Sequence, residues 1–334
     1  VNLAASAQKK FSVYAVGFYN QENLFDTCHD EGKKDYEYLP NKGWNGMKYT
    51  NKLRNMSKAL ADMGTDVLPN VGCAFIGLSE VENHKVLDAL VDQAPLKARN
   101  MKYVHIEGPD RRGIDCALLY NPSLFSVKNV KLLPYVQELA KDSAFFTRGF
   151  LTVRGEMAGD DVAVIVCHWP SRFSGPFYRE SAARQVKVIK DSLLNVNQEM
   201  KIFVMGDMND DPVNKSMHVY LQAKPEISQV GAGDMYNPWY NVLAKEGKGT
   251  LFYSGNWNLF DQIVITPNLL NKDAKKKDYS SLKYWKSHIF RRDYLIQQEG
   301  QYKGAPLRTT AGGRWLNGYS DHLPVVMYLV KEKK

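Results

Sequence analysis

The chain has 334 residues, of which 44% are hydrophobic and 24% are charged, a composition typical of a globular protein that buries a core. No apolar stretch is long enough to span a bilayer, and the lack of any fixed-period repeat or low-complexity tract excludes a repeat protein. The net charge of +8 at pH 7 favours an anionic partner such as nucleic acid, a phosphorylated small molecule or an acidic membrane surface, although a solvated basic face would give the same charge.

The first ten residues, VNLAASAQKK, carry small side chains in an A-x-A arrangement at Ala5, Ser6 and Ala7. This pattern is typical of the end of a secretory signal peptide and its cleavage site. We therefore expect residues 1–10 to be a tail or signal-peptide remnant. The protein is then expected to act outside the cytoplasm, in a periplasm or as a secreted protein. An artificial leader or a disordered tail is the alternative.

The first expected strand covers residues 11–20, which are rich in β-forming side chains, and a long polar loop follows it. Apolar residues then recur at spacings of three and four over residues 47–63, which predicts an amphipathic helix. Residues 73–80 form a short apolar run that ends in an acid and predict a buried strand. Residues 83–95 predict a second helix, which Pro95 stops.

Strands dominate the remainder of the chain, with one further helix expected at residues 177–196. The other expected strands cover residues 101–106, 113–120, 125–133, 145–157, 161–169, 201–210, 250–255, 259–266 and 323–330. Many of these strands follow one another without an intervening helix. This order predicts mixed sheets packed against each other with helices outside, rather than the strand–helix alternation of a Rossmann fold.

No change of composition divides the chain, so we expect a single domain over residues 11–334. Residues 262–319 stand out because they hold a run of lysines, several arginines and aromatic residues between two core strands. A connection of this length usually has a function or is mobile. We expect it to border the mouth of the site described below and to select substrate.

The four cysteines show no C-x-x-C spacing, which gives no support for a zinc or redox site. Cys116 and Cys167 lie inside apolar runs, so we expect them to be buried. A disulfide between Cys28 and Cys73 is left open.

Several strands end in acids, amides or imidazoles. These polar residues are Asn20, Glu22, Glu80, His168, Asp207, Asn209, Asp261, Asp321 and His322. Each has an ordinary structural explanation: Glu80 could cap a helix, the Gly-Asp-Met-Asn-Asp stretch could be a turn, and His168 could be a core histidine. Their repeated occurrence at the ends of apolar runs favours one shared site at the mouth of the sheets.

These stretches resemble the endonuclease/exonuclease/phosphatase superfamily, the metal-dependent phosphohydrolases related to deoxyribonuclease I, and in particular an exported bacterial branch. The resemblance rests on the ordered motifs FYNQENLFD, GLSEVEN, RRGIDCALLY, CHWPSR, GDMND, FDQIVIT and YSDHLPV, which run from residue 18 to residue 325. It implies an α/β fold, a four-layer sandwich in which two central mixed β-sheets pack face to face with helices outside.

The resemblance also implies a divalent metal, with Mg²⁺ expected and Mn²⁺ or Ca²⁺ as alternatives. Glu80 matches the principal metal-binding Glu of the family, and Asp321 would add a second or water-mediated ligand. Glu22 occupies a position where some members place another acid. Asn20 resembles the Asn that steadies the phosphate or the metal shell.

For catalysis, Asp207 matches the Asp that positions or deprotonates the attacking water, and Asn209 matches the amide that orients it. His322 is similar to the catalytic His beside the scissile phosphate, and Asp261 to its carboxylate partner. His168 matches a second His that would protonate the leaving oxygen or stabilise the transition state. Four arginines are candidates for phosphate contacts, with structural ion pairs as the alternative: Arg112, Arg148, Arg172 and Arg184.

The implied function is a metal-dependent phosphoric ester hydrolase, best interpreted as a monomeric phosphodiesterase or nuclease that acts on nucleic acid. The alternatives are a phosphatase and a sphingomyelinase-like phospholipid phosphodiesterase, so the substrate is a phosphodiester or a phosphomonoester. A non-catalytic binding module is the most distant alternative. It would be expected to lack Glu80, Asp207 or His322, and the sequence contains all three.

Overall fold

The computed structural model describes residues 10–138 and 145–333. All but the last residue of the expected tail at residues 1–10 therefore lies outside the described residues. The start of the first strand lies beside the end of the chain, since Lys333 N–H donates to the Lys10 carbonyl at 2.8 Å. Within the described ranges, no helix combines the length and the apolar character needed to cross a membrane.

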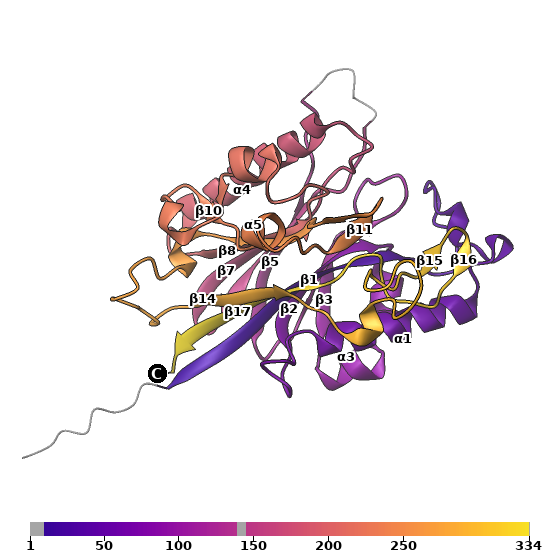
Figure 1. Cartoon of the computed structure of the whole chain (residues 1–334), viewed down its shortest axis with the longest axis horizontal. Helices are drawn as coiled ribbons and strands as arrows, with labels where there is room; N and C mark the ends of the chain where they lie inside the picture. The colour runs from indigo at the N-terminus through magenta and orange to yellow at the C-terminus, as the bar shows by residue number, and fades with distance from the viewer. Residues whose placement is uncertain (1–9, 139–144, 334) are drawn as a thin grey trace, which may run out of the picture.

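The first sheet is mixed and has six strands (Figure 1). In spatial order these are β14 (Lys283–Ile289), β17 (Val325–Glu332), β1 (Phe11–Leu24), β2 (Cys73–Val81), β4 (Asp115–Tyr120) and β3 (Lys102–His105). Strands β1 and β2 are parallel, and the other neighbours are antiparallel.

The second sheet is also mixed and has seven strands. In spatial order these are β5 (Phe125–Leu133), β6 (Phe150–Met157), β7 (Asp160–His168), β8 (Lys201–Asp207), β13 (Asp261–Ile265), β10 (Met235–Tyr236) and β9 (Ala223–Lys224). Two small hairpins stand apart from these sheets: β11 (Leu251–Tyr253) with β12 (Asn256–Asn258), and β15 (Thr310–Ala311) with β16 (Arg314–Trp315).

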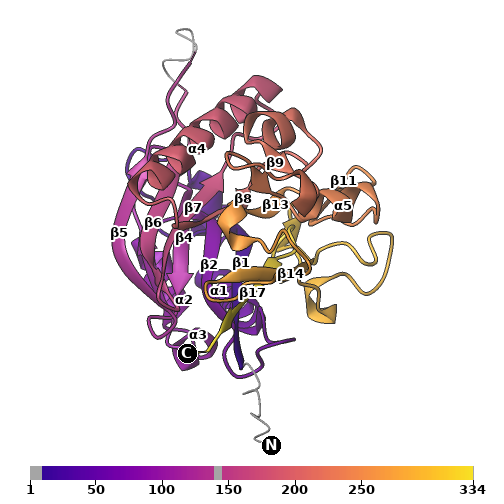
Figure 2. The same ribbon diagram turned by 90° about the vertical axis from the view of Figure 1, so that its left-hand side faces the viewer.

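A shared apolar core joins the two sheets, with Phe18 and Phe75 from the first meeting Val164 and Phe203 from the second, all fully buried. Helices α1 (Gly46–Asp62), α2 (His84–Val91) and α3 (Ala94–Ala98) contribute to a separate cluster with the first sheet. Helix α4 (Pro176–Val196) and the π-helix η4 (Ser216–Tyr220) pack on the second sheet. Figures 1 and 2 show α4 on the opposite side of the sheets from α1 and α3. The predicted four-layer sandwich is therefore confirmed.

The remaining helices are short. They are α5 (Trp239–Ala244) and the 3-10 turns η1 (Tyr36–Tyr38), η2 (Pro40–Lys42), η5 (Ile227–Gln229), η6 (Pro267–Leu269) and η7 (Asp293–Leu295). The predicted helix at residues 83–95 is wrong in one respect, because it forms two helices. Asn83 caps α2 by accepting hydrogen bonds from the next turn, and Pro95 lies in the first turn of α3, where its missing N–H costs nothing.

Cys28 is exposed and Cys73 is buried, and neither forms a disulfide. Cys116 and Cys167 are buried as predicted. Within residues 262–319 the sequence analysis did not predict β14, which forms the edge of the first sheet next to β17.

Candidate active site

The strand register gathers three of the predicted residues at one end of the second sheet. Parallel pairing of β7 with β8 places His168 opposite Asp207. Antiparallel pairing of β8 with β13 places Asp207 opposite Asp261. The first sheet supplies Glu80 from the end of β2, and an isolated bridge holds His322 against Leu251. Residues far apart in the sequence therefore meet where the two sheets open.

The backbone is irregular at this mouth. The register between β1 and β2 shifts between Asn20 and Leu24, and the register between β2 and β4 shifts at Glu80, between Ser79 and Val81. Glu22, Glu80 and Asn209 have φ angles of 44°, 60° and 50°. A left-handed backbone conformation at a residue other than glycine costs about 1–3 kcal/mol and tends to occur at functional sites. The bulges redirect Glu22 and Glu80 away from the regular alternation of a strand, and Asn209 follows the end of β8.

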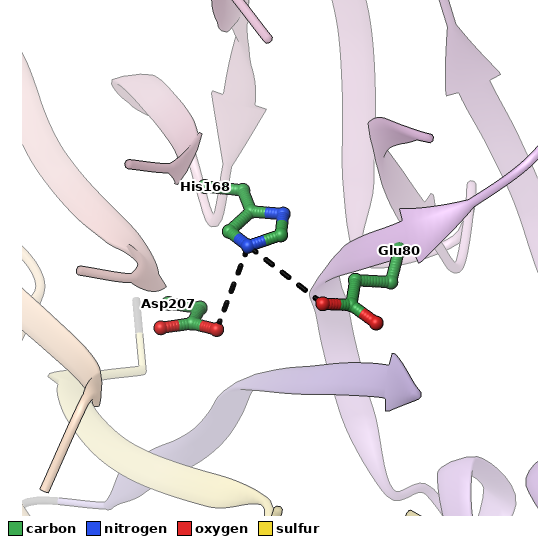
Figure 3. A group of neighbouring side chains, drawn as sticks. All are labelled: Glu80, His168 and Asp207. Atoms are coloured by element: carbon green, nitrogen blue, oxygen red, sulfur yellow. Dashed lines mark ion pairs between the residues drawn. The ribbon is translucent and has the colours of Figure 1, made fainter. Parts of the chain in front are cut away.

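Glu80, His168 and Asp207 form a group around one ring nitrogen (Figure 3). His168 Nε2 lies 3.8 Å from Glu80 Oε1 and 3.7 Å from Asp207 Oδ2. The other ring nitrogen, Nδ1, is buried without a hydrogen-bond partner. Asn23 N–H donates to the second Glu80 oxygen at 3.0 Å. Both acids thus approach the same imidazole nitrogen, and the three ligand atoms lie within 4.8 Å of one another.

Two amides hold the Asp207 carboxylate in place. Asn20 Nδ2 donates to its Oδ2 at 3.0 Å, and the main-chain N–H of Asn209 donates to its Oδ1 at 2.9 Å. The side-chain amide of Asn209 donates instead to the Trp169 carbonyl at 2.9 Å. In this structure Asn20 and Asn209 therefore orient Asp207.

His322 forms a second group with Asp261 and Asp207. Its Nδ1 lies 2.7 Å from Asp261 Oδ2, an oxygen that also accepts a hydrogen bond from the Thr250 hydroxyl at 2.5 Å. Its Nε2 lies 3.8 Å from Asp207 Oδ2 and 3.9 Å from Asp321 Oδ1. Asp261 thus fixes the ring and directs Nε2 toward the other acids.

The two histidines differ in charge. Burial lowers the pKa of His168 well below its usual value, and Arg148 and Arg112 lower it further, so this imidazole is neutral. Burial would also lower the pKa of His322, but Asp261 and Asp207 outweigh burial and raise the pKa well above its usual value. Burial raises the pKa of Asp207 to about 6 against the lowering effect of His322. The imidazolium of this site is therefore His322.

Glu22 lies in a neighbouring network of charged residues for which the sequence has no motif. Arg308 joins it to Asp321, with Nε 3.2 Å from Glu22 Oε1 and an NH2 3.2 Å from Asp321 Oδ2. The second Glu22 oxygen accepts a hydrogen bond from Thr309 N–H at 2.5 Å. Lys52 is fully buried beneath this network and donates to the Thr309 hydroxyl at 2.6 Å.

Opposite charges compensate one another in this network. Burial and the nearby Asp321 raise the pKa of Glu22 to about 7, while burial lowers the pKa of Lys52 to about 8. A signal for Lys52 was present in the sequence, because it lies three residues after Tyr49 and four before Met56, on the apolar face of α1. Glu22 is thus held by cations and is not part of the group around Glu80.

The four predicted arginines separate into two pairs. Arg112 and Arg148 line the cavity at the site, and Arg148 also forms a 3.0 Å ion pair with Asp110. Arg172 and Arg184 are absent from its lining and pair with Asp211 at 2.8 Å and Glu138 at 2.7 Å respectively. The structure therefore brings only the first pair to the site. Asp115, at the start of β4, pairs with His105 at 2.9 Å.

A cavity of about 360 Å³ connects these groups. We call the predicted catalytic and metal-binding residues of its lining the floor: Glu80, His168, Asp207, Asn209, Asp321 and His322. We call the other lining residues the rim: Arg112, Phe145, Phe146, Thr147, Arg148, Pro170, Ser171, Ser174 and Leu251. Phe146 is half exposed, with the guanidinium of Arg111 5.4 Å from its ring centre. The floor is polar and the rim offers an aromatic face, an arrangement that suits a phosphate group joined to a larger organic group.

The donor set at the floor fits a hard divalent cation. Among the described residues, neither Glu80 nor Asp207 has a Lys or Arg side chain within ion-pair distance. Asp207 has the His322 imidazolium 3.8 Å away, whereas the ion-pair contact described for Glu80 is with the neutral His168. A largely buried carboxylate in this position is costly unless a cation neutralises it. Carboxylate oxygens beside an imidazole are suitable ligands for Mg²⁺ or Mn²⁺. These residues could therefore hold a metal ion.

Sequence comparison shows that a model of the endonuclease/exonuclease/phosphatase family matches residues 15–331. No curated protein sequence matches the chain.

Solved structures with the same fold cover nearly the whole chain. ANGEL2, a 2′,3′-cyclic phosphatase, is 12% identical with a TM-score of 0.59, and the match covers 98% of this chain and 99% of that one. The mannosyl-6-phosphatase of Bacteroides thetaiotaomicron is 14% identical with a TM-score of 0.56 and coverage of 95% and 99%. D. rerio TDP2 in complex with a single-strand DNA product is 11% identical with a TM-score of 0.55 and the same coverage. At these identities the likeness shows the fold alone.

Proposed function

The chain belongs to the endonuclease/exonuclease/phosphatase family, whose members hydrolyse phosphoesters, and on this basis we propose that it cleaves phosphodiester bonds of nucleic acid with the help of Mg²⁺. The observation that carries the proposal is the convergence of Glu80, His168, Asp207 and His322 on one cavity. A binding module would have no need to bury two carboxylates and an imidazolium together at the cost that burial imposes.

Glu80 is the residue best placed to hold the metal, with Asp207 or Asp321 as a second carboxylate. When bound, the ion supplies Lewis-acid stabilisation of negative charge on the phosphate oxygens. Mn²⁺ is expected to replace Mg²⁺ because both prefer carboxylate oxygens. Ca²⁺ also binds oxygen ligands but takes more of them, about six to eight, so it is a weaker candidate for this small donor set.

Asp207 is proposed as the base that accepts the proton of the attacking water. Its two oxygens are fixed by Asn20 and by the Asn209 main chain, so it enters the reaction with its direction set. A pKa of about 6 is closer to neutrality than that of a free Asp, which makes the carboxylate a better proton acceptor and still leaves it ionised at neutral pH.

His322 is proposed to stabilise charge on the phosphate. Its imidazolium is held by Asp261, so its Nε2–H can be directed at an anionic oxygen without reorganisation. His168 is neutral in the free protein. A phosphate anion placed beside it would raise its pKa, and this would allow it to donate a proton to the leaving oxygen.

The rim favours nucleic acid over the two alternatives. The half-exposed Arg112 is suited to a neighbouring phosphate, and the exposed face of Phe146 is suited to stacking on a base. Arg148 is buried and donates to Asp110 and to the Trp169 carbonyl, so it adds positive charge to the cavity from a fixed position. The single-strand DNA product named for the D. rerio structure supports a nucleic-acid strand on this fold. The phosphatases with the same fold support a phosphomonoester as the second candidate.

A substrate panel tests this choice. With Mg²⁺ present, we expect cleavage of plasmid DNA, RNA or both, together with slow hydrolysis of bis-p-nitrophenyl phosphate. Sphingomyelin and inositol phosphates should remain intact. The His322→Ala variant, prepared in the same way, controls for contaminating nucleases. Release of phosphate from monoesters without any strand cleavage would overturn the nuclease in favour of a phosphatase.

A further inference from the structure

A second cavity lies on the other side of the strand pairing that holds His322. Its volume is about 530 Å³. The lining comes from the end of α5, the β11–β12 hairpin, the end of β14 and the loop after it, elements that lie near one another in Figure 2. No residue of the catalytic floor belongs to this cavity.

The charge of this second cavity is positive. It holds Lys248, Arg291 and Lys303 but a single acid, Glu246, which pairs with Lys248 at 2.8 Å in an exposed ion pair. Among the described residues, the one hydrogen-bond acceptor of the Arg291 side chain is the Gly304 carbonyl, at 3.0 Å. Lys303 is exposed and has no ion pair or side-chain hydrogen bond among the residues that the structure describes. Two of the three cations thus face the cavity without an acidic partner, which favours an anion.

The rest of the lining contains an indole and aliphatic side chains, together with the polar Ser287 and His288, and His288 pairs with Asp66 at 3.2 Å. The half-buried indole of Trp257 packs beside Phe252 with ring centres 5.2 Å apart, and Val242, Ile289 and Leu323 provide aliphatic surface. An inorganic anion would use the cations but leave this surface in water. A ligand that carries a flat apolar group next to its negative charge would cover both.

The walls of the cavity are connected to the catalytic pair. Leu323 follows His322, and its N–H donates to the Thr250 carbonyl at 2.8 Å. Thr250 in turn donates its hydroxyl to Asp261, the partner of His322. Gly249 lies so close to the Asn258 carbonyl that a Cβ would be 2.4 Å from its oxygen, so this wall has no room for a side chain. A ligand here would therefore contact the segments that hold the imidazolium.

We propose that this cavity binds a nucleotide, with its phosphate between Lys303 and Arg291 and its base against Trp257. Two sources have this chemistry: a distal nucleotide of the strand being cleaved, which rests on the proposed function, and a free nucleotide that acts as an effector. Arg291 and Lys303 both belong to the segment 262–319, so part of the positive charge of this segment lies at the second cavity. The lysine run at residues 275–277 lines neither cavity.

Binding without turnover gives the first test. Adenosine monophosphate is titrated into the full protein in EDTA and the heat is recorded. Lys303→Glu is compared with Lys276→Glu, which makes the same change of charge at another exposed lysine. We expect Lys303→Glu to weaken binding by about tenfold or more, since a charge-assisted phosphate contact is lost and repulsion replaces it. Equal affinity in the two variants would overturn the site.

Turnover then separates the two sources. If the ligand is the distal part of the strand, the ratio of KM for a long single strand to KM for a dinucleotide rises in Lys303→Glu and not in Lys276→Glu. If it is a free nucleotide, added adenosine monophosphate changes the rate of dinucleotide cleavage in Lys276→Glu but not in Lys303→Glu. Because the binding test needs no reaction, it fails or succeeds independently of whether the protein is a nuclease.

Discussion

Replacement of His322 by Ala is expected to lower kcat by about 10²–10³-fold, the loss typical of removing one preorganised donor that stabilises transition-state charge. The imidazolium is held by Asp261 at 2.7 Å and lies 3.8 Å from Asp207, so its loss removes both a fixed cation and the partner of a buried acid. The contact with phosphate strengthens as charge develops in the transition state. KM should therefore rise far less than kcat falls, in steady-state assays of a natural diester.

The His105–Asp115 pair provides a matched control. It is a buried His–Asp pair with a separation of 2.9 Å, and neither residue lines the catalytic cavity. His105→Ala should therefore reproduce the structural cost of losing such a pair, seen as a lower melting temperature, without the loss of kcat. Wild-type rates in folded His322→Ala would remove this histidine from the mechanism.

His168 can be distinguished from His322 with the same assay. If His168 protonates the leaving oxygen, His168→Ala should be partly rescued on p-nitrophenyl esters, whose leaving group departs without a proton. His322→Ala should show no such rescue, because the charge that it stabilises is on the phosphate. Equal losses for both variants on activated and natural substrates would show that these roles are assigned wrongly.

Glu80→Gln is expected to weaken Mg²⁺ binding by at least about tenfold, and to lower activity at limiting metal by a similar factor. The substitution keeps the shape of the side chain but removes the charge that attracts the ion, at a position where no Lys or Arg side chain of the described residues forms an ion pair. Even outer partners of metal ligands affect metal affinity by about 10–100-fold. Isothermal titration with MgCl₂ measures the change directly.

Glu82→Gln is the control for this substitution. Glu82 is buried two residues further along, and burial raises its pKa to about 8, but it accepts a hydrogen bond from Asp26 N–H at 2.7 Å and does not line the cavity. With this pKa the carboxyl is largely protonated at neutral pH, so Glu82→Gln tests only the effect of an amide at a neighbouring buried position and should leave Mg²⁺ affinity as in the wild type. If Glu80→Gln also kept wild-type affinity, Glu80 would not be a ligand.

The sequence predicts the main parts of the fold because apolar runs and polar ends follow directly from burial. The strands that carry His168 and Asp207 are uninterrupted apolar runs, and the register of a sheet then places their last residues together. Edge strand β14 was missed because its sequence, KYWKSHI, contains lysines and no apolar run. This segment becomes a strand because it pairs with β17 in the folded chain.

The least predictable features of the site are those that depend on contacts between distant segments. Arg308 lies in a long connection, and only the folded chain shows that it joins Glu22 to Asp321. The left-handed backbone at Glu22 and Glu80 also has no signal in the sequence, because Glu has no preference for that conformation. For the same reason, the sequence could not show that Glu22 faces Arg308 and Thr309.

Glu80 and its neighbours are proposed to hold a metal ion and so to make this cavity a phosphodiesterase site. The most direct measurement is the rate of bis-p-nitrophenyl phosphate hydrolysis before and after treatment with EDTA, followed by titration with Mg²⁺ or Mn²⁺. We predict that chelation abolishes turnover and that either ion restores it, with Glu80→Gln needing more metal for the same rate. Full activity in the presence of excess chelator would contradict the account.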